Sequence, residues 1–275
     1  MLRFLPLAAS ALLLPGCGAE PAAGEQREES TASAAAQAEG ASPSTSATSQ
    51  ANGALKVSEA NDVYTFDYAY PAAAGRIAPL RELLDARMEE AREKHVALAI
   101  DARADADEGG YPFNPYGSGT EWQVVANLPD WLSLSANYWE YTGGAHGNSW
   151  FGALLWDKQA GEPREPLSLF TSPEALEAVV QGEFCDLLDR QREEKRGQPV
   201  TRDPQDWASA CIGLDAATVI LGSTNRRTFD RIGFLVAPYN AGPYAEGSYE
   251  VTLPVGRAIL GVVKPEYRSA FSAVR

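Results

Sequence analysis

The chain has 275 residues, 45% of them hydrophobic, and a formal net charge of −14. This acidic balance argues against a nucleic-acid-binding function, because phosphate groups attract basic proteins. It leaves a cationic protein partner open, and it is equally typical of secreted bacterial proteins whose charge serves solubility.

The N-terminus carries a predicted lipoprotein signal, residues 1–16. Arg3 precedes an apolar run at positions 4–14 that is too short to span a bilayer as a mature helix. The letters LPGC at 14–17 resemble a bacterial lipobox, in which the signal is cleaved before Cys17 and the cysteine receives acyl chains such as palmitate. Those chains suffice for stable membrane attachment. Gly18, in place of an aspartate, favours the periplasmic face of the outer membrane. The alternative is an ordinary secretory signal with a chance cysteine.

A polar tether is predicted between the lipidated cysteine and the folded body, over residues 17–56. No aromatic residue and no isoleucine occurs from position 18 to position 63. We expect disorder there, because such a composition cannot bury enough apolar area to offset its ordering entropy. The remaining chain is long enough for a sizeable core, and we expect two sub-domains, 57–160 and 161–275.

The first sub-domain is predicted to contain one strand, one helix and a three-stranded antiparallel meander. An aromatic, alternating strand is expected at Tyr64–Tyr70, and a helical apolar period follows over Pro79–Arg103. The meander comprises Glu121–Leu128, Trp131–Tyr141 and Ser149–Trp156. In its middle strand, one face carries Leu132, Leu134, Ala136 and Tyr138, and the other carries Trp131, Ser133, Ser135, Asn137 and Trp139.

The second sub-domain is predicted to pair another helix with further strands. Ser172 is a suitable N-cap for a helix that starts at Pro173 and stops at Gly197. Strands are expected at 229–237 and 249–253, whereas 254–263 fits a short helix or a strand equally well. The sequence therefore predicts an α+β fold, with antiparallel sheets and two main helices packed on them.

Two cysteines remain once Cys17 is assigned to the lipid. In an oxidising compartment Cys185 and Cys211 most simply pair with each other. In the chain-entropy model a loop of this length stabilises the fold by roughly 3 to 4 kcal/mol. The pair would join the second helix to the loop that follows it.

The usual catalytic and cofactor motifs are missing from the sequence. There is no H-E-x-x-H, no G-x-S-x-G, no P-loop and no G-x-G-x-x-G. The two histidines, His95 and His146, cannot form a multi-histidine metal site. The acidic stretch at 101–110 fails the EF-hand pattern at Gly109 and Tyr116. We expect no metal, no cofactor and a structural role for His95 at the border of its helix's apolar stripe.

The stretch YWEYTGGAHGNSW, residues 138–150, places His146 between glycines and aromatic side chains. Gly143, Gly144 and Gly147 permit positive φ, so a tight hairpin is one interpretation. The functional interpretation is a recognition surface that combines His146 with Trp139, Tyr141 and Trp150. His146 could also act as a general base, although the sequence supplies no nucleophile for it.

A second aromatic loop, PYNAGPYAEG, occupies residues 238–247 between two predicted strands. It could be a structural crossover whose tyrosines pack on the sheet. It could instead be a binding surface formed by Tyr239, Tyr244 and Glu246.

Together these two stretches resemble a bacterial envelope family. It includes the extracellular domain of the anti-sigma factor RsiV and the non-catalytic N-terminal region of the peptidoglycan deacetylase PdaC. The matching residues are Tyr141, Gly143, Gly144, Ala145, His146, Gly147, Pro238, Tyr239, Pro243, Tyr244, Ala245, Glu246 and Gly247. The resemblance spans about residues 57–263, with a PdaC-like first half and an RsiV-like second half.

The resemblance implies an α+β fold outside the cytoplasmic membrane and, from RsiV, binding to lysozyme. Deacetylase chemistry belongs to a separate catalytic domain of PdaC, so it is not carried over. Sigma-factor regulation is not carried over either, because this chain has a lipobox where RsiV has a membrane span.

Three hypotheses for function follow from the sequence. The first is a lipid-anchored, non-enzymatic envelope protein that binds peptidoglycan glycan or a protein such as lysozyme. The alternative is an envelope hydrolase acting on cell-wall material with His146 and Glu246 as an acid/base pair, which requires the two loops to meet. The third is a structural lipoprotein without a small ligand.

Overall fold

The computed structural model describes residues 44–49 and 52–274. The signal peptide, the predicted lipidation site at Cys17 and most of the predicted tether lie outside these residues. Within the described ranges, no helix has both the length and the apolar character needed to cross a membrane.

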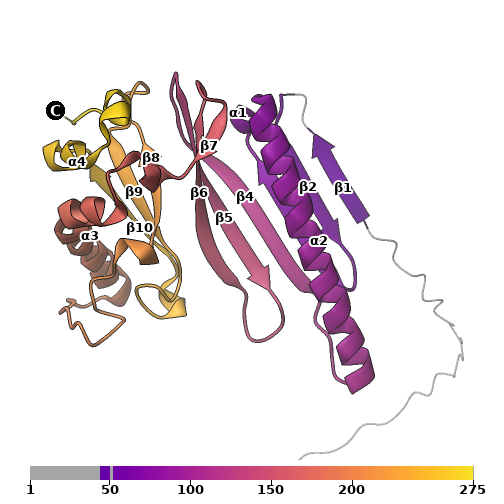
Figure 1. The fold of residues 1–275 in the computed structure, drawn as a ribbon. Coiled ribbons are helices and arrows are strands. Elements are labelled where there is room, and N and C mark those ends of the chain that lie inside the picture. The colour runs from indigo at the N-terminus through magenta and orange to yellow at the C-terminus, as the bar shows by residue number, and fades with distance from the viewer. Residues whose placement is uncertain (1–43, 50–51, 275) are drawn as a thin grey trace, which may run out of the picture. The chain divides into compact units, whose positions relative to one another are not determined.

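The first half of the described chain forms a seven-stranded sheet whose strands follow one another in sequence order (Figure 1). Its strands are β1 (Ser44–Ser49), β2 (Leu55–Ala60), β3 (Tyr64–Tyr70), β4 (Tyr116–Asn127), β5 (Trp131–Tyr141), β6 (Asn148–Asp157) and β7 (Glu162–Arg164). The meander predicted from sequence corresponds to β4, β5 and β6, which pair antiparallel. Neighbours pair antiparallel throughout, except for the parallel pair β3–β4.

That parallel pair is explained by the helix between its strands. A short helix, α1 (Ala72–Gly75), and the long helix α2 (Ala78–Gly109) carry the chain back to the end of the sheet at which β3 begins, so β4 starts beside the start of β3. Such a crossover is what a parallel pair requires. The helix extends six residues beyond the predicted end at Arg103 and stops at Gly110, which adopts the left-handed conformation with φ of 67°.

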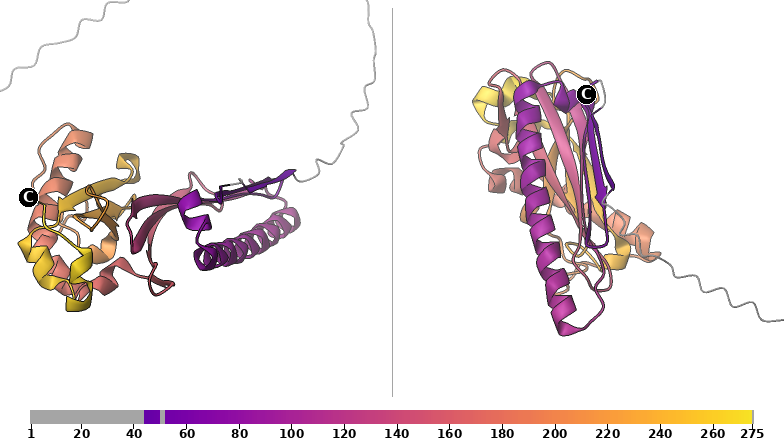
Figure 2. Two further views of the ribbon diagram at one scale, coloured as in Figure 1. Left: turned by 90° about the horizontal axis from the view of Figure 1, so that it is seen from above. Right: turned by 90° about the vertical axis from the view of Figure 1, so that its right-hand side faces the viewer.

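Helix α2 covers one face of the sheet (Figure 2). Leu80 and Leu84 on the helix pack against Phe66, Trp122 and Leu134 of the strands, and all five are buried. The alternation predicted for β5 is confirmed, because Leu132, Leu134, Ala136 and Tyr138 belong to this core.

The second half of the chain forms a three-stranded antiparallel sheet packed on helix α3 (Pro173–Arg196). Its strands are β8 (Thr218–Gly222), β9 (Arg231–Val236) and β10 (Tyr249–Pro254). Ser172 caps α3 as predicted, since its hydroxyl accepts a hydrogen bond from the Ala175 amide at 3.1 Å. The segment that fitted helix or strand is helix α4 (Arg257–Val262).

A second hydrophobic core joins this half to the meander. Leu154 of β6 belongs to the core under α2, whereas its neighbour Leu155 belongs to the core with α3 and β8–β10. Consecutive strand residues point to opposite faces of a sheet, so the two cores lie on opposite faces of β6. The fold class predicted from sequence, α+β with two main helices on mostly antiparallel sheets, is therefore confirmed.

Three strands depart from the sequence-based expectations. Ser44–Ser49 is strand β1, paired with β2, where the sequence predicted part of a disordered tether. Its residues are polar and show no alternation with apolar residues, so the strand depends on backbone pairing with β2. Strand β2 was not predicted from the sequence, and it begins at Leu55, inside the predicted tether. Strand β8 at 218–222 was not predicted either, because its short run lies in a segment without a clear alternating pattern.

Candidate functional site

The two tryptophans of the hairpin strands lie on opposite faces of the sheet. Trp150 pairs with Tyr138 across β5 and β6, and their rings stack with centroids 5.5 Å apart on the α2 face. Trp139 follows Tyr138 in β5 and points to the other face, which we call the distal face. The two indoles are almost equally accessible, 42% and 41% exposed. Both residues nevertheless contribute to the lining of one groove.

Two glycines make room for the Trp139 indole. A β-carbon built on Gly117 would lie 2.6 Å from Trp139 Cζ3, and one on Gly147 would lie 2.5 Å from Trp139 Nε1. Neither position can take a side chain while the ring stays where it is. The indole therefore lies against bare backbone of β4 and of the hairpin, which fixes its orientation. Gly147 serves this close approach, whereas Gly143 and Gly144 have φ near 90° and form the turn.

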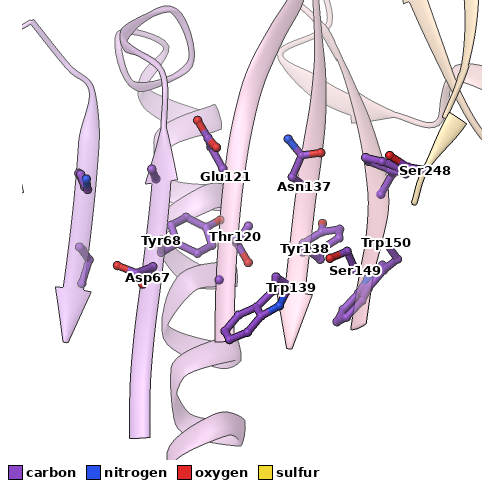
Figure 3. Close-up of a pocket in the computed structure, with 15 residues that line it drawn as sticks. Asp67, Tyr68, Thr120, Glu121, Asn137, Tyr138, Trp139, Ser149, Trp150 and Ser248 are labelled. Carbon is purple, nitrogen blue, oxygen red and sulfur yellow. The ribbon is translucent and has the colours of Figure 1, made fainter. Parts of the chain in front are cut away.

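Trp139 borders a groove on the distal face, about 620 Å³ in volume (Figure 3). We call it the sheet groove. Its lining includes Lys56, Asp67, Gly119, Glu121, Asn137, Trp139, Ser149, Trp150 and Ser248. A β-carbon on Gly119 would meet no atom within 4 Å, so the groove has open backbone at its base. An exposed aromatic ring beside polar groups is the usual composition of a small-ligand site.

The two sequence stretches singled out above meet beside this groove. His146 stacks on Tyr244 with ring centroids 3.8 Å apart, and its Nε2 lies 3.3 Å from the Tyr239 hydroxyl. The Tyr244 hydroxyl donates to the carbonyl of Gly147 at 2.8 Å. His146 Nδ1 lies 2.9 Å from the same carbonyl and donates its proton to it. We call His146, Tyr239 and Tyr244 the tyrosine–histidine cluster.

Tyr239 adopts a backbone conformation that is unfavourable for a bulky residue. Its φ is 71°, in the left-handed region, and its side chain is 50% exposed. Such a conformation costs roughly 1 kcal/mol or more and is found mainly where the surroundings impose it. The strain is consistent with a residue that is held in place for a task other than stability.

Helix α3 holds the loop at residues 238–247, which we call the tyrosine loop, through Arg192, Lys195 and Arg196. The Arg192 guanidinium is fully buried and donates from Nε to the carbonyl of Ala241 at 2.9 Å. Lys195 Nζ donates to the carbonyl oxygens of Glu246 and Ser248, each at 2.6 Å. The loop is therefore positioned by the helix before any ligand arrives.

Glu246 completes this anchoring through Arg196. Arg196 donates from Nε and Nη2 to the two carboxylate oxygens of Glu246, each at 2.9 Å, and Tyr249 donates its hydroxyl to the same carboxylate. Burial raises the pKa of Glu246, but the hydrogen bonds from Arg196 and Tyr249 outweigh burial and leave the pKa below its usual value. In the described part of the chain, none of its hydrogen bonds goes to His146. Glu246 is thus a structural anchor of the loop rather than an available acid.

The remaining predicted residues have local structural contacts. Tyr141 donates its hydroxyl to the carbonyl of Gly144 at 3.2 Å, which closes the hairpin. Cys185 and Cys211 are joined by a disulfide, with Cα atoms 5.5 Å apart, between α3 and the loop after it. His95 is buried against Tyr64 and Phe66, and burial lowers its pKa.

Asp67, Gly119, Glu121 and Asn137 were not identified from the sequence. They lie on three different strands and come together only through sheet register. Each is an ordinary strand residue in its own segment. Only the alternation of β5 placed Asn137 and Trp139 on one face in advance.

Residues 57–149 match the model of the family described as Deacetylase PdaC. The matched range runs from β2 to the start of β6, so the resemblance to the PdaC N-terminal region is confirmed there. The match indicates an envelope-related protein. No curated protein sequence is detectably similar to this chain.

Two solved structures also align with most of the chain. A member of the DUF3298 family from Bacteroides fragilis is 18% identical, with a TM-score of 0.46, and the alignment covers 84% of this chain and 96% of that one. A DUF3298 family protein from Pseudomonas aeruginosa is 16% identical, with a TM-score of 0.42, and the alignment covers 85% of this chain and 97% of that one.

Proposed function

We propose that this protein is a lipid-anchored, non-enzymatic component of the bacterial cell envelope that binds peptidoglycan glycan in the sheet groove. The observation that carries the proposal is Trp139, an exposed indole that lies against Gly117 and Gly147 beside the sheet groove. A sugar ring offers an apolar face to an aromatic ring and hydroxyls to the polar groups around it. A rigid aromatic side chain suits this purpose because little conformational entropy is lost on binding.

The surroundings of Glu246 support binding over the hydrolase alternative. An acid/base pair of His146 and Glu246 would need a carboxyl free to exchange protons with a substrate. Both carboxylate oxygens of Glu246 are instead held by Arg196, and the side chain is only 13% exposed. His146 is likewise committed to Tyr239, Tyr244 and the hairpin backbone.

The lipid anchor in this proposal rests on the sequence around Cys17. The motif LPGC after an apolar run is the support for lipidation and for the periplasmic face of the outer membrane as its location. Cys17→Ser should move the protein from the membrane pellet to the soluble fraction and should abolish incorporation of labelled palmitate. Unchanged pelleting and labelling would contradict the anchor.

The glycan proposal is tested by co-sedimentation with purified insoluble peptidoglycan. Trp139 is 42% exposed, which corresponds to roughly 60–100 Å² of indole surface available to a ligand. At about 25 cal/mol per Å², covering that surface contributes around 2 kcal/mol, so Trp139→Ala should weaken binding by about tenfold or more. Trp207→Ala is the matched control, because Trp207 is 56% exposed and does not line the sheet groove.

The same preparation distinguishes a protein partner. If the chain binds lysozyme with micromolar affinity and does not sediment with peptidoglycan, the glycan assignment is wrong and a lysozyme-binding role replaces it. Equal losses in Trp139→Ala and Trp207→Ala would place the glycan outside the sheet groove.

A further inference from the structure

We infer that the sheet groove selects glycans that carry a free amine, such as de-N-acetylated amino sugars, over fully N-acetylated ones. This inference rests on the proposed function and adds the chemical class of the ligand. It follows from the positions of Asp67 and Glu121 relative to Trp139.

The register of the strands surrounds Gly119 with these side chains. Asp67 of β3 pairs with Gly119 of β4, and Gly119 pairs with Trp139 of β5. Adjacent strands are about 4.8 Å apart, so Asp67 and Trp139 lie roughly 10 Å apart at their Cα atoms with a bare glycine between them. Glu121 follows two residues along β4 on the same face, about 7 Å from Gly119. A ligand that covers the indole and continues across the groove passes over Gly119 and reaches both carboxylates.

Asp67 and Glu121 have no charged partner within the described ranges. Both side chains are exposed, and neither occurs among the ion pairs formed by the described residues. This contrasts with Glu59, which lies on β2 and is paired with Arg92 at 2.7 Å. The carboxylates of the groove are therefore available to a ligand.

The chemistry of a carboxylate decides which sugar substituent fits. An ionised carboxylate only accepts hydrogen bonds, and an ammonium group supplies three donors with a positive charge. An N-acetyl group at the same place supplies one donor and brings a carbonyl oxygen and a methyl group toward the carboxylate. Lys56 is the cation lining the groove, two strands from Glu121, so the formal charge of these three side chains remains negative.

Isothermal titration of the purified, detergent-solubilised full chain tests this selectivity. The probes are a glucosamine tetramer, an N-acetylglucosamine tetramer and trilysine, at neutral pH and low ionic strength. Exposed ion pairs contribute little each, so we expect the glucosamine tetramer to bind about three- to tenfold more tightly than the acetylated one. Trilysine should bind more weakly than the glucosamine tetramer, because it has no ring to lie on Trp139.

Variants separate the groove from the overall acidity of the chain. Asp67→Asn combined with Glu121→Gln should equalise the two tetramers and leave the acetylated tetramer unaffected. Asp101→Asn, on an exposed position of α2, is the matched control and should keep the preference. Melting temperatures of all variants check that each is folded.

Each other outcome has a defined meaning. Equal binding of both tetramers, lost in Trp139→Ala, overturns the amine preference and leaves the proposed glycan binding intact. An equal effect of Asp101→Asn, or trilysine binding as tight as the glucosamine tetramer, also overturns it, because charge alone would then explain the result. Binding of neither tetramer overturns both the preference and the proposed function.

Discussion

Removal of the Arg196 guanidinium should destabilise the protein measurably. In the structure this group donates to both carboxylate oxygens of Glu246 and, through Nη2, to the carbonyl of Ala208 at 2.8 Å. The two charged side chains are only 16% and 13% exposed. Arg196→Met keeps most of the aliphatic stem and leaves a largely buried carboxylate with the Tyr249 hydroxyl as its side-chain hydrogen-bond donor.

The expected loss lies between those of a surface pair and a fully buried one. Exposed pairs contribute about 0–1 kcal/mol, and breaking a fully buried pair costs roughly 3–5 kcal/mol. We therefore expect Arg196→Met to lower the free energy of unfolding by about 2–3 kcal/mol at pH 7. For a folded body of this size the melting temperature should fall by roughly 4–12 °C. Adding Glu246→Gln should recover part of that loss, because no charge is then left unpaired.

The pH dependence follows from the lowered pKa of Glu246. A carboxyl whose pKa is depressed by folding contributes stability above its unfolded pKa, and this contribution disappears as the pH falls through the folded pKa. The difference in unfolding free energy between the wild type and Arg196→Met should therefore be largest near pH 7 and shrink below pH 4.5. Urea denaturation of both proteins at several pH values measures it. A loss below about 0.5 kcal/mol at pH 7, or a difference that does not change with pH, would refute the reasoning.

Three further changes test the disulfide, the tyrosine loop and the contact of the Trp139 indole with Gly117. Replacing both disulfide cysteines by serine should lower the free energy of unfolding by about 2–4 kcal/mol, and wild type with reductant should lose the same amount; no change with reductant would show that the bond is absent in solution. Tyr239→Gly should leave the melting temperature nearly unchanged, because relief of the positive φ offsets the lost ring contacts with His146 and Tyr244; a large thermal loss would make Tyr239 a stability residue. Gly117→Ala should shift the fluorescence of Trp139, while Gly119→Ala should not, because only a β-carbon at position 117 would meet the indole ring. Equal spectra of the two variants would contradict the close contact between Trp139 and Gly117.

The sequence predicted those helices and strands that are specified by a local pattern, such as alternating apolar residues or a helix cap. Strand β5 was predicted with its observed ends, because Leu132, Leu134 and Ala136 alternate along it and are buried on one face. Its other face is buried at Trp131 and exposed at Trp139. Helix α3 was predicted from a cap and a proline at its start and a glycine at its end, each of which acts on the backbone next to it. Strand β1 was missed because its polar sequence carries no such pattern and it depends on pairing with β2.

The candidate site was only partly predictable, because some of its residues are neighbours in the sequence and others come together only in the fold. The hairpin glycines and the stretch at 238–247 indicated two loops, but not that Tyr244 would stack on His146. Trp139 and Trp150 were grouped from the sequence and both line the groove, although strand alternation directs consecutive side chains of β5 and β6 to different faces. The groove beside Asp67 and Glu121 depends on the parallel register of β3 with β4, which no local pattern specifies.

The anchoring of the tyrosine loop also lay beyond sequence reasoning. Glu246 was identified as a candidate because an acidic residue in an aromatic loop can serve either binding or chemistry. Its partner Arg196 lies 50 positions earlier, at the end of α3. A distant ion pair of this kind leaves no periodic signal, so the structural role of the carboxylate emerged only with the fold.

The most direct test of glycan binding in the sheet groove is the response of the tryptophan indole N–H signals to a glycan. The chain contains six tryptophans, so ¹H–¹⁵N spectra of the indole groups can be assigned by single substitutions. On titration with an amino-sugar tetramer, the Trp139 signal should shift progressively to saturation, while the signal of Trp207, which does not line the groove, stays in place. Saturable binding that shifts Trp207 and leaves Trp139 unchanged would contradict the assignment of the groove as the binding site.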